Sequence, residues 1–383
     1  MYKSFKVILH PNNKQRIKMF QCFGVSRFAH NWALNRQQGN YKNGGKFLSA
    51  FDLQKEFGQL KKLSEFSWLN EYSSAISSMA IIDACTSYKN FFRGNSDFPK
   101  FKNKKSKQSF YIPGAEIKFN STHVKLVRIA DSKKKNKLKL NWVKLAEVGR
   151  VPTDCKYSNP RVTFDGINFW LSVSIEVNDS VEVPTNEGIG IDLGIKDLAI
   201  CSDGHVYRNI NKTREVKRLE KKKRRLQRKL SKKYTINKHE KTKNILKLEK
   251  ELLKLNHRLT SIRHNYTHQV TTEIVKRKPS FISLEDLNVS GLMKNRHLAK
   301  AIQEQSFYSF KEILSYKAKW NNIKIIEVPR FYPSSKTCSC CGSVKSDLKL
   351  SDRVFICPEC GNKIDRDLNA SINLKNYGLS TLK

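Results

Sequence analysis

Four cysteines near the C-terminus have the spacing of a metal site. Cys338 and Cys341, and then Cys357 and Cys360, form two C-x2-C pairs separated by fifteen residues, and a glycine follows each pair. Four thiolates satisfy Zn²⁺ tetrahedrally, and a glycine after the second cysteine supplies the positive φ of a knuckle turn. We therefore expect a coordinatively closed, structural zinc site. A disulfide framework and unligated thiols are the alternatives.

The remaining cysteines do not fit this pattern. Cys340 lies inside the first pair and could compete as a ligand, but it directly precedes Cys341, so we expect it to be a bystander. The other four are scattered singly and are typical of small buried or half-buried side chains in a reducing compartment: Cys22, Cys85, Cys155 and Cys201.

Three acidic residues stand at the ends of predicted core elements. Asp192 ends the strand in "GIGID", Glu285 ends the strand in "SFISLED", and Asp367 starts the last helix. Carboxylates that gather in one place repel one another unless cations neutralise them, and Mg²⁺ or Mn²⁺ prefer such oxygen ligands. A pair of these ions activates a water and stabilises a leaving oxygen, which is the chemistry of phosphodiester hydrolysis.

Each acid also has a simpler explanation when it is taken alone. Asp192 could be a turn residue, and Glu285 or Asp286 could cap a helix. Asp365 or Asp367 could be the N-cap of the helix "LNASINLKNY", and Asp365 is the nearest alternative to Asp367 as a metal ligand. Only the position of all three acids at core element ends favours the metal site.

The charge of the chain predicts a polyanionic partner. The 383 residues carry 73 Lys and Arg against 34 Asp and Glu, a net charge of +39, which favours nucleic acid. An anionic membrane is the rival, but no run approaches eighteen apolar residues and no lipidation motif appears. The N-terminus "MYKSFKVILHPNN" lacks the apolar stretch of a signal peptide. We expect a cytoplasmic protein that associates with the nucleoid when it is on DNA.

The apolar pattern changes along the chain. A strand at 1–10 precedes helical patterns that continue to about Phe92, and short alternating segments follow from Phe98 to Val183. "VEVPTNE" is a plausible linker. After residue 188, strands alternate with helices, which is typical of an α/β domain. The final helix is predicted to end near Gly378.

A very basic helical region follows the first strands of this α/β domain. From Lys217 to Lys233 there are eleven Lys or Arg and one acid, so we expect a phosphate-facing surface rather than a solvated helix of alternating charge. Apolar residues spaced 3 and 4 apart continue after "SKKYTINK", which interrupts the pattern: Ile245, Leu248, Leu252, Leu255, Leu259 and Ile262. An intramolecular helical hairpin is predicted, with an oligomeric coiled coil as the alternative.

The motifs closely resemble those of the OrfB/TnpB proteins of bacterial insertion sequences, relatives of the compact type V CRISPR effectors. The segments that carry this resemblance are "GIGIDLGIKDLAICSDG", "SLEDLNVSGLMKNRHLAKAIQEQSF", "YPSSKTCSCCG" and "CPECGNKIDRDLNASINL". "FPKFKNKKSKQSF" and "LNWVKL" match family segments further upstream. The departures are Cys340, where another small polar residue is common, and Ser371, where the family often has alanine.

The resemblance implies an α/β fold with β-barrel and helical domains. Its expected parts are a wedge-like β-barrel (1–12 and 97–184), a helical recognition domain (13–96), an RNase H-like (RuvC) nuclease domain (185–335 and 363–383) and a zinc-binding target nucleic-acid-binding module (336–362). The basic hairpin at 212–268 would lie within the nuclease domain, with Lys221, Lys222, Arg224 and Arg225 as expected nucleic-acid ligands.

The function implied by this resemblance is an RNA-guided, Mg²⁺-dependent DNA endonuclease of a mobile genetic element. It would cut double-stranded DNA complementary to a guide RNA, next to a short flanking motif, as a monomer on one RNA. The RuvC-type catalytic acids would be Asp192, Glu285 and Asp367. A nuclease-silent RNA-guided DNA-binding regulator and a DNA strand-transferring transposase are the alternatives. The regulator would need lost carboxylates, and such transposases generally place Glu last in the acidic triad.

Overall fold

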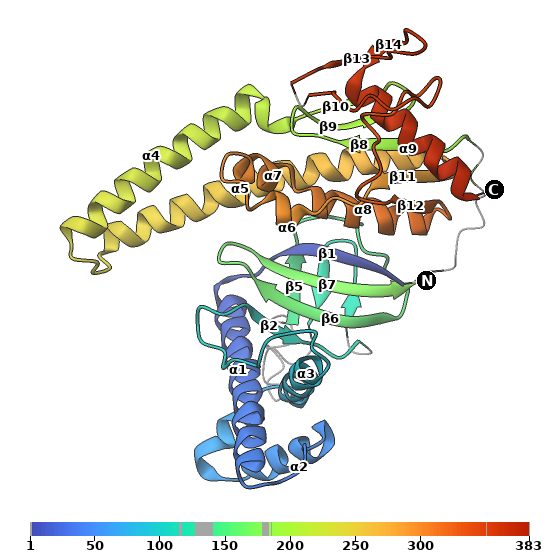
Figure 1. Ribbon diagram of the computed structural model, residues 1–383. Helices are drawn as coiled ribbons and strands as arrows, with labels where there is room; N and C mark the ends of the chain where they lie inside the picture. Colours follow the sequence, from blue (N-terminus) through green and yellow to red (C-terminus); the bar gives the residue numbers. More distant parts are fainter. Residues whose placement is uncertain are drawn as a thin grey trace. The chain divides into compact units, whose positions relative to one another are not determined.

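The computed structural model describes residues 2–114, 117–126, 141–177, 184, 186–349 and 351–382. The chain folds as two compact units, Met1–Asn178 and Asp179–Lys383. The first unit runs from blue to green in Figure 1, and the second runs from green to red. Within the described ranges, no helix is both long enough and apolar enough to cross a lipid bilayer.

One antiparallel sheet organises the first unit, with the strand order β2-β6-β7-β1-β5-β4-β3. The strands are Tyr2–His10 (β1), Gln108–Tyr111 (β2), Lys118–Phe119 (β3), His123–Lys125 (β4), Trp142–Leu145 (β5), Tyr157–Phe164 (β6) and Phe169–Glu176 (β7). Alternate side chains of β7, from Phe169 to Ile175, are buried, as in a sheet with one face on a core. Among the described strands β2 and β3 end this order, so closure into a barrel stays a prediction. The predicted alternating segment at 127–140 lies outside the described residues.

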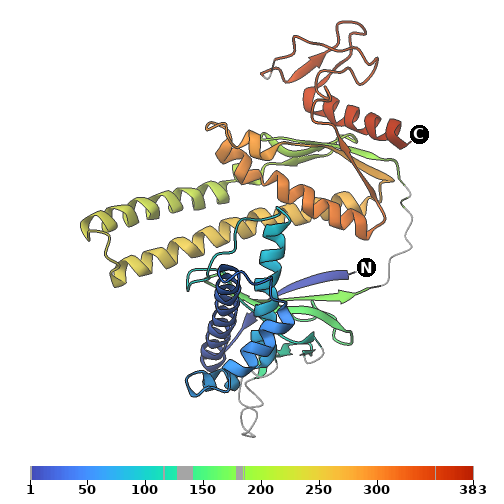
Figure 2. The ribbon, with the colours of Figure 1, turned by 60° about the horizontal axis from the view of Figure 1, so that its bottom comes forward.

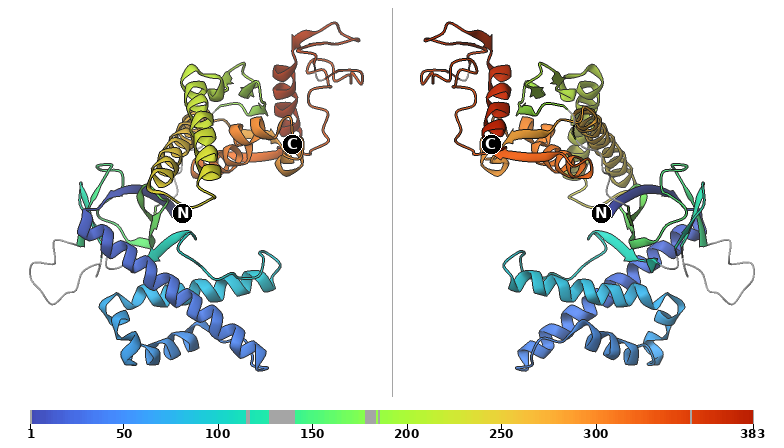
Figure 3. Two further views of the ribbon diagram at one scale, coloured as in Figure 1. Left: turned by 90° about the vertical axis from the view of Figure 1, so that its left-hand side faces the viewer. Right: turned by 90° about the vertical axis from the view of Figure 1, so that its right-hand side faces the viewer.

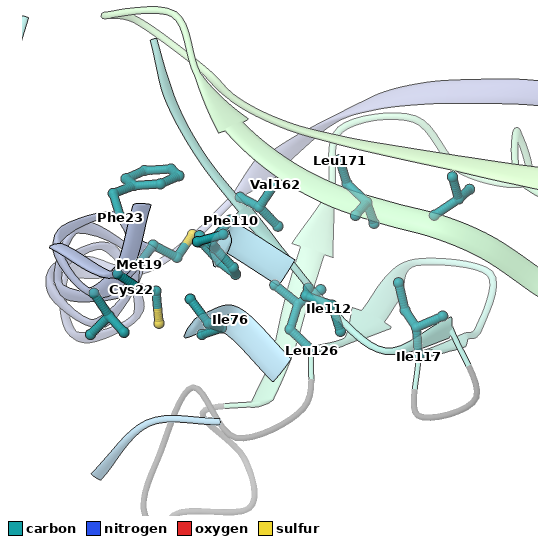
Figure 4. Packing of buried hydrophobic residues seen from close by; sticks show 14 of the residues in the cluster. Met19, Cys22, Phe23, Ile76, Phe110, Ile112, Ile117, Leu126, Val162 and Leu171 are labelled. Carbon is teal, nitrogen blue, oxygen red and sulfur yellow. The ribbon is translucent and has the colours of Figure 1, made fainter. Parts of the chain in front are cut away.

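Helices cover this sheet and share its core. They are Asn13–Lys42 (α1), Ala50–Leu60 (α2), the 3-10 helix Ser64–Glu71 (η1) and Ser74–Phe92 (α3). Helix α1 starts with a reciprocal capping box between Asn12 and Gln15. Figure 4 shows Met19 and Phe23 of α1 meeting Phe110 of the sheet. The helical pattern predicted for this part of the sequence is confirmed.

The second unit is built on a five-stranded mixed sheet with the order β10-β9-β8-β11-β12. The strands are Ile189–Leu193 (β8), Asp197–Cys201 (β9), Val206–Arg208 (β10), Phe281–Glu285 (β11) and Lys324–Val328 (β12). Strands β8, β9 and β10 pair antiparallel, whereas β11 lies parallel to both β8 and β12. The predicted α/β character of this half is confirmed.

Helices lie on both faces of this sheet. The helices of the second unit are Ile210–Lys212 (η4), Arg214–Ile236 (α4), Lys243–Lys276 (α5), Val289–Leu292 (α6), Ala299–Gln305 (α7), Phe307–Trp320 (α8) and Arg366–Leu382 (α9). Ile189 and Ile191 of β8 pack in one core with residues of α5 and α8. Gly190, between them, faces α9, and a Cβ at this position would collide with the carbonyl oxygen of Ser371. Since side chains alternate along a strand, α9 lies on the opposite face from α5 and α8.

The basic region forms the predicted hairpin, with α4 and α5 side by side in Figures 1 and 2. Val216, Leu219, Leu255 and Leu259 are buried between the two helices. The helix break begins within the predicted interruption "SKKYTINK", because α4 ends at Ile236 and α5 starts at Lys243. The hydroxyl of Tyr234 donates a hydrogen bond of 2.5 Å to Glu249 of α5, which holds the last turn of α4 in place.

The last helix is longer than predicted. Helix α9 continues through Gly378 to Leu382. Gly378 does not end the helix but packs against the ring of Phe281, where a Cβ would collide. A short antiparallel pair, Val354–Ile356 (β13) and Lys363–Asp365 (β14), leads from the cysteine region into α9 (Figure 3). The proposed linker "VEVPTNE" lies mostly outside the described residues.

Candidate active site and zinc centre

Asp192 and Glu285 end two neighbouring parallel strands. Strands β8 and β11 pair with Leu284 beside Ile191, so the next residues, Asp192 and Glu285, lie at the same carboxyl edge of the sheet. Ile191 and Leu284 point into the core with α5 and α8. Because side chains alternate, the two carboxylates lie on the other face, which α9 covers.

Asp367 joins them from the first turn of α9. It lines, with Asp192 and Glu285, one cleft of about 870 Å³. Asp365 has a different role: its Oδ1 accepts hydrogen bonds from the backbone N–H groups of Asp367 and Leu368, at 3.0 and 3.1 Å. Asp365 therefore caps the helix, and Asp367 is the acid of this pair that lines the cleft.

The three cleft carboxylates have no side-chain hydrogen bond or ion pair within the part of the chain that the structure describes. Asp286, the neighbour of Glu285, is in contrast fully engaged. It accepts a hydrogen bond of 2.8 Å from Nη2 of Arg330, and Nζ of Lys311 lies 3.6 Å away. Such unpartnered carboxylates fit the oxygen-ligand preference of a divalent cation.

The electrostatics of the site agree with this arrangement. Burial, and then the charges of Asp367 and Glu285, raise the pKa of Asp192 to about 7. Burial, and then the charge of Asp286, also raise the pKa of Glu285. Neighbouring carboxylates in a partly dry cleft disfavour one another's ionised forms unless a cation is present.

Cations stand around the acids in the same cleft. The basic residues that line it are Lys196, Lys212, Lys336, Arg353 and Arg366. Nζ of Lys212 donates a hydrogen bond of 2.7 Å to the carbonyl oxygen of Lys196, which ties it to the β8–β9 turn. A cleft lined by both carboxylates and basic groups suits a substrate that carries phosphates.

The four predicted zinc ligands come together. Their ligand atoms all lie within 4.8 Å of one another: Cys338, Cys341, Cys357 and Cys360. Among the described residues, this is the only set of three or more His, Cys, Asp or Glu side chains grouped so closely. The Sγ–Sγ distances of 3.7 Å (Cys338–Cys360) and 3.5 Å (Cys341–Cys357) approach the edge of about 3.8 Å that follows from tetrahedral Zn–S bonds of about 2.3 Å.

The backbone of the two knuckles repeats. Gly342 and Gly361 have φ of 80° and 69°, as the sequence predicts. In each knuckle the glycine N–H donates to the first cysteine's carbonyl oxygen, at 3.0 Å to Cys338 and 3.2 Å to Cys357. Backbone N–H groups, that of Cys360 first, lower the pKa of Cys357, whereas the backbone N–H of Asn362 is outweighed by the neighbouring thiols, which raise the pKa of Cys360. Without a cation the clustered thiols disfavour one another's ionised forms. Cys340 is exposed and outside the cluster.

Two buried asparagines of α9 hold the first knuckle. Nδ2 of Asn369 donates to the carbonyl oxygen of Thr337 at 2.7 Å, and its Oδ1 accepts from the N–H of Ser339 at 2.9 Å. Nδ2 of Asn373 donates to the carbonyl oxygens of Ser334 and Thr337. The cysteine module is therefore fixed to the helix that carries Asp367.

The four predicted nucleic-acid ligands lie on α4. Lys221, Lys222, Arg224 and Arg225 are all exposed. Lys222 lies 3.2 Å from Glu251 of α5, an exposed ion pair of small energetic weight. The structure leaves this face of the hairpin open to a phosphate backbone.

A polar network behind the cleft was not predicted from the sequence. Arg263 of α5 bonds Oδ1 of Asn211 at 2.7 Å and pairs with Glu220 and Glu304, at 3.1 and 3.3 Å. Buried Gln305 donates from Nε2 to the carbonyl oxygen of Gly194, at 2.9 Å, beside Asp192. No local pattern could show this network, because its members come from four separate elements.

Comparison with known proteins gives matches along the whole chain. A family model described as "Helix-turn-helix domain" matches residues 1–46, one described as "Probable transposase" matches 172–296, and one described as "Cas12f1-like, TNB domain" matches 307–374. The first two models are of OrfB proteins of the IS605 type. A Streptomyces pristinaespiralis protein is 27% identical over 99% of this chain and 90% of its own length. Escherichia coli (strain K12) InsQ is 28% identical over 99% of this chain and 93% of its own.

Residues 1–46 and 172–296 thus match models of OrfB proteins, and the two relatives extend the similarity to 99% of the chain. Both relatives are named as RNA-guided DNA endonucleases. The chain also matches a solved structure, "Cryo-EM structure of the Cas12f1-sgRNA-target DNA complex", with a TM-score of 0.64, 14% identity and coverage of 98% of this chain and 99% of that one. This likeness shows a shared fold. Residues 1–46 form β1 and the single long helix α1, although the matching family model is described as a helix-turn-helix.

Proposed function

We propose that this chain is an OrfB/TnpB-type RNA-guided, Mg²⁺-dependent DNA endonuclease of an insertion sequence. It cuts double-stranded DNA complementary to a guide RNA, beside a short flanking motif. The observation that carries the proposal is the placement of Asp192, Glu285 and Asp367 in one cleft, with no side-chain partner in the described part of the chain. The names of the full-length relatives support the reaction and the guide.

The donor set of the cleft fits hard divalent ions. Asp192 and Glu285 approach from adjacent strand ends and Asp367 from α9, so carboxylate oxygens are offered from the sheet and from a helix. When bound, Mg²⁺ or Mn²⁺ at such carboxylates supplies an activated water and charge neutralisation at a leaving oxygen. The chain itself positions the three acids, and the lysines and arginines that line the cleft attract the phosphates of the substrate.

The domain assignment is part of the proposal. The strand order β10-β9-β8-β11-β12, with helices on both faces, supports an RNase H-like (RuvC) nuclease domain at 185–335 and 363–383. The cysteine cluster supports a zinc-bound module at 336–362. Residues 1–12 and 97–184 are assigned to the wedge-like domain, and 13–96 to the recognition helices. The partners are a guide RNA and target DNA, bound by a monomer in the cytoplasm.

The experiment that tests this function joins two measurements. The chain is purified after co-expression with its element's flanking DNA, and the copurified RNA is sequenced. The complex is then given supercoiled plasmid with a matching target and Mg²⁺. One RNA of defined sequence and cutting only at the matched target are expected. Random RNA fragments, or cutting independent of the RNA, would refute guidance.

Two rival functions predict other results. A nuclease-silent regulator would bind the matched target without cutting it, although all three acids are present here. A transposase would join the DNA strands it cuts, which sequencing of the plasmid ends detects.

A further inference from the structure

An almost fully exposed phenylalanine stands in the wall of the carboxylate cleft. Phe331 is 93% exposed, more than any other large apolar side chain in the described ranges. It lines the same cleft as Asp192, Glu285 and Asp367. Covering an aromatic ring that is otherwise exposed to water lowers the free energy of the system. Its position therefore points to a ligand that also reaches the acids.

The backbone holds this ring in place. Pro329 and Pro333 restrict the turn on either side of Phe331, and the N–H of Tyr332 donates to the carbonyl oxygen of Pro329 at 2.9 Å. Arg330 anchors the turn to Asp286 through its Nη2, at 2.8 Å. The turn therefore presents the Phe331 ring from a fixed base.

The ring of Tyr332 packs edge-on against Tyr377 of α9, with 5.1 Å between centroids. This contact turns the Tyr332 ring toward the helix that carries Asp367, and it adds a second anchor to the turn. The residue that follows Phe331 in the turn is thus held by its contact with Tyr377.

The residues around Phe331 indicate which class of ligand would bind there. The cleft is lined by the ring, by lysines and arginines that attract phosphates, and by the three carboxylates. An apolar peptide would gain nothing from this charge, whereas single-stranded nucleic acid uses both features, because its bases stack on aromatic rings and its phosphates pair with cations. A base within a duplex is already stacked on its neighbours, so only an unpaired base can cover Phe331.

We propose that Phe331 is a stacking platform for an unpaired nucleobase beside the phosphodiester that is cut. This inference rests on the proposed nuclease function. Stacking on Phe331 fixes the strand so that the phosphate next to the stacked base lies over the carboxylates. The ring acts on any base, because every base offers a π-face, and it adds no sequence preference of its own.

A fluorescence measurement tests the contact without cutting. The RNA complex of the Asp192→Ala variant is mixed with target DNA that carries 2-aminopurine at successive positions around the cut site. Quenching is expected at one position, and it should vanish in Phe331→Leu and persist in Phe331→Trp. Tyr308→Leu is the matched control, since Tyr308 is also exposed, at 65%, but does not line the cleft. Equal quenching with and without the Phe331→Leu substitution would overturn the proposal.

A cleavage measurement then separates the two proposals. With active complex, Phe331→Leu should lower kcat by about 5- to 150-fold and change the half-saturating substrate concentration much less, because base pairing with the guide dominates binding. An abasic site at the quenched position should do the same, and the two changes together should cost no more than either alone. Additive losses would overturn the stacking. A wild-type complex that cuts nothing, but shows the quenching, would refute the nuclease function and leave the stacking site standing.

Discussion

Asn369 of helix α9 donates a hydrogen bond of 2.7 Å to the carbonyl oxygen of Thr337, the residue before the first zinc ligand. Its Oδ1 accepts the N–H of Ser339, so one fully buried amide satisfies two backbone groups of the first knuckle. Asp367 lies two residues earlier on the same helix. The zinc module and the candidate catalytic acid are thus fixed to one rigid element.

Replacing Asn369 with Ala is expected to loosen this joint while the zinc ligands stay intact. The carbonyl of Thr337 keeps a hydrogen bond from Asn373, but the N–H of Ser339 loses its partner. Ser339 is half-buried, so the loss of this hydrogen bond should cost about 1 kcal/mol, the low end of the range for an unsatisfied group. Thermal denaturation should show a lower Tm, and metal analysis should still find one zinc per chain. A variant with unchanged Tm and unchanged cleavage would show that the joint has no role.

Replacing Cys357 with Ser should remove the zinc and reduce solubility together. A module of about twenty-five residues is too small to build a sufficient core without a metal. Cys340→Ser is the matched control, since Cys340 is exposed and outside the cluster, and it should keep full zinc content. Atomic absorption on both purified variants is the measurement. A soluble, folded Cys357→Ser protein with one zinc would contradict the ligand assignment.

The pKa of Asp192 predicts how stability depends on pH. Its value of about 7 in the folded chain lies above the ordinary 3.8, so the folded state binds more protons between these values. The free energy of unfolding of the Mg²⁺-free protein therefore falls as pH rises through this window. Asp192→Asn should raise Tm at pH 8 by at least about 2–4 °C, the effect of roughly 1 kcal/mol, and by less at pH 5.5.

The control for this pH effect is Asp286→Asn. Asp286 is paired with Arg330 and Lys311, so its neutralisation should give no gain in Tm at either pH. Millimolar Mg²⁺ should raise the Tm of the wild type more than that of Asp192→Asn. An Asp192→Asn protein less stable than the wild type at pH 8 without Mg²⁺ would show that the carboxylate is needed for the fold.

The basic hairpin should contribute affinity that falls with salt. Each phosphate that the protein no longer neutralises is expected to reduce the slope of log affinity against log salt by about 0.7–0.9. Changing Lys221, Lys222, Arg224 and Arg225 together to Gln should therefore flatten the slope for RNA binding, measured by filter binding at several salt concentrations. The comparison variant changes four exposed lysines of α5 by the same charge: Lys243, Lys247, Lys250 and Lys254. An equal slope of log affinity against log salt in the wild type and the α4 variant would show that these four side chains do not contact the RNA.

The sequence predicted the parts of the site that depend on short-range patterns. Cysteine spacing and the following glycines determine a knuckle locally, so Cys338 to Cys360 could be placed before any fold was known. Asp192 and Glu285 were recognisable because buried strands end in acids there, and adjacent parallel strands bring their ends together. The family resemblance favoured Asp367 over Asp365, and the structure adds a physical reason, since Asp365 accepts the N–H groups at the start of α9.

Long-range packing accounts for what the sequence could not show. A glycine near the end of a helical pattern is typical of a helix C-terminus, but Gly378 instead allows α9 to pack closely against the ring of Phe281. The last turn of α4 is joined to α5 by the hydrogen bond from Tyr234 to Glu249 across the hairpin. The network from Arg263 to Gln305 joins residues far apart in sequence. The exposure of Phe331 could not be predicted either, because the residue type alone does not tell whether a phenylalanine is buried or exposed.

The central claim is that the cleft carboxylates hold the metals that cut guided DNA. It is tested most directly by giving the RNA complex of Asp192→Ala a plasmid with a matched target, and measuring cleavage in Mg²⁺ and target binding by gel shift in parallel. Cleavage should fall below detection while binding stays within about threefold, because binding draws on base pairing and phosphate contacts. The wild-type complex should cut in Mg²⁺ and poorly in Ca²⁺, whose coordination is larger and looser. Cutting by Asp192→Ala at the wild-type rate, or equal cutting by the wild type in Ca²⁺, would contradict the two-metal nuclease.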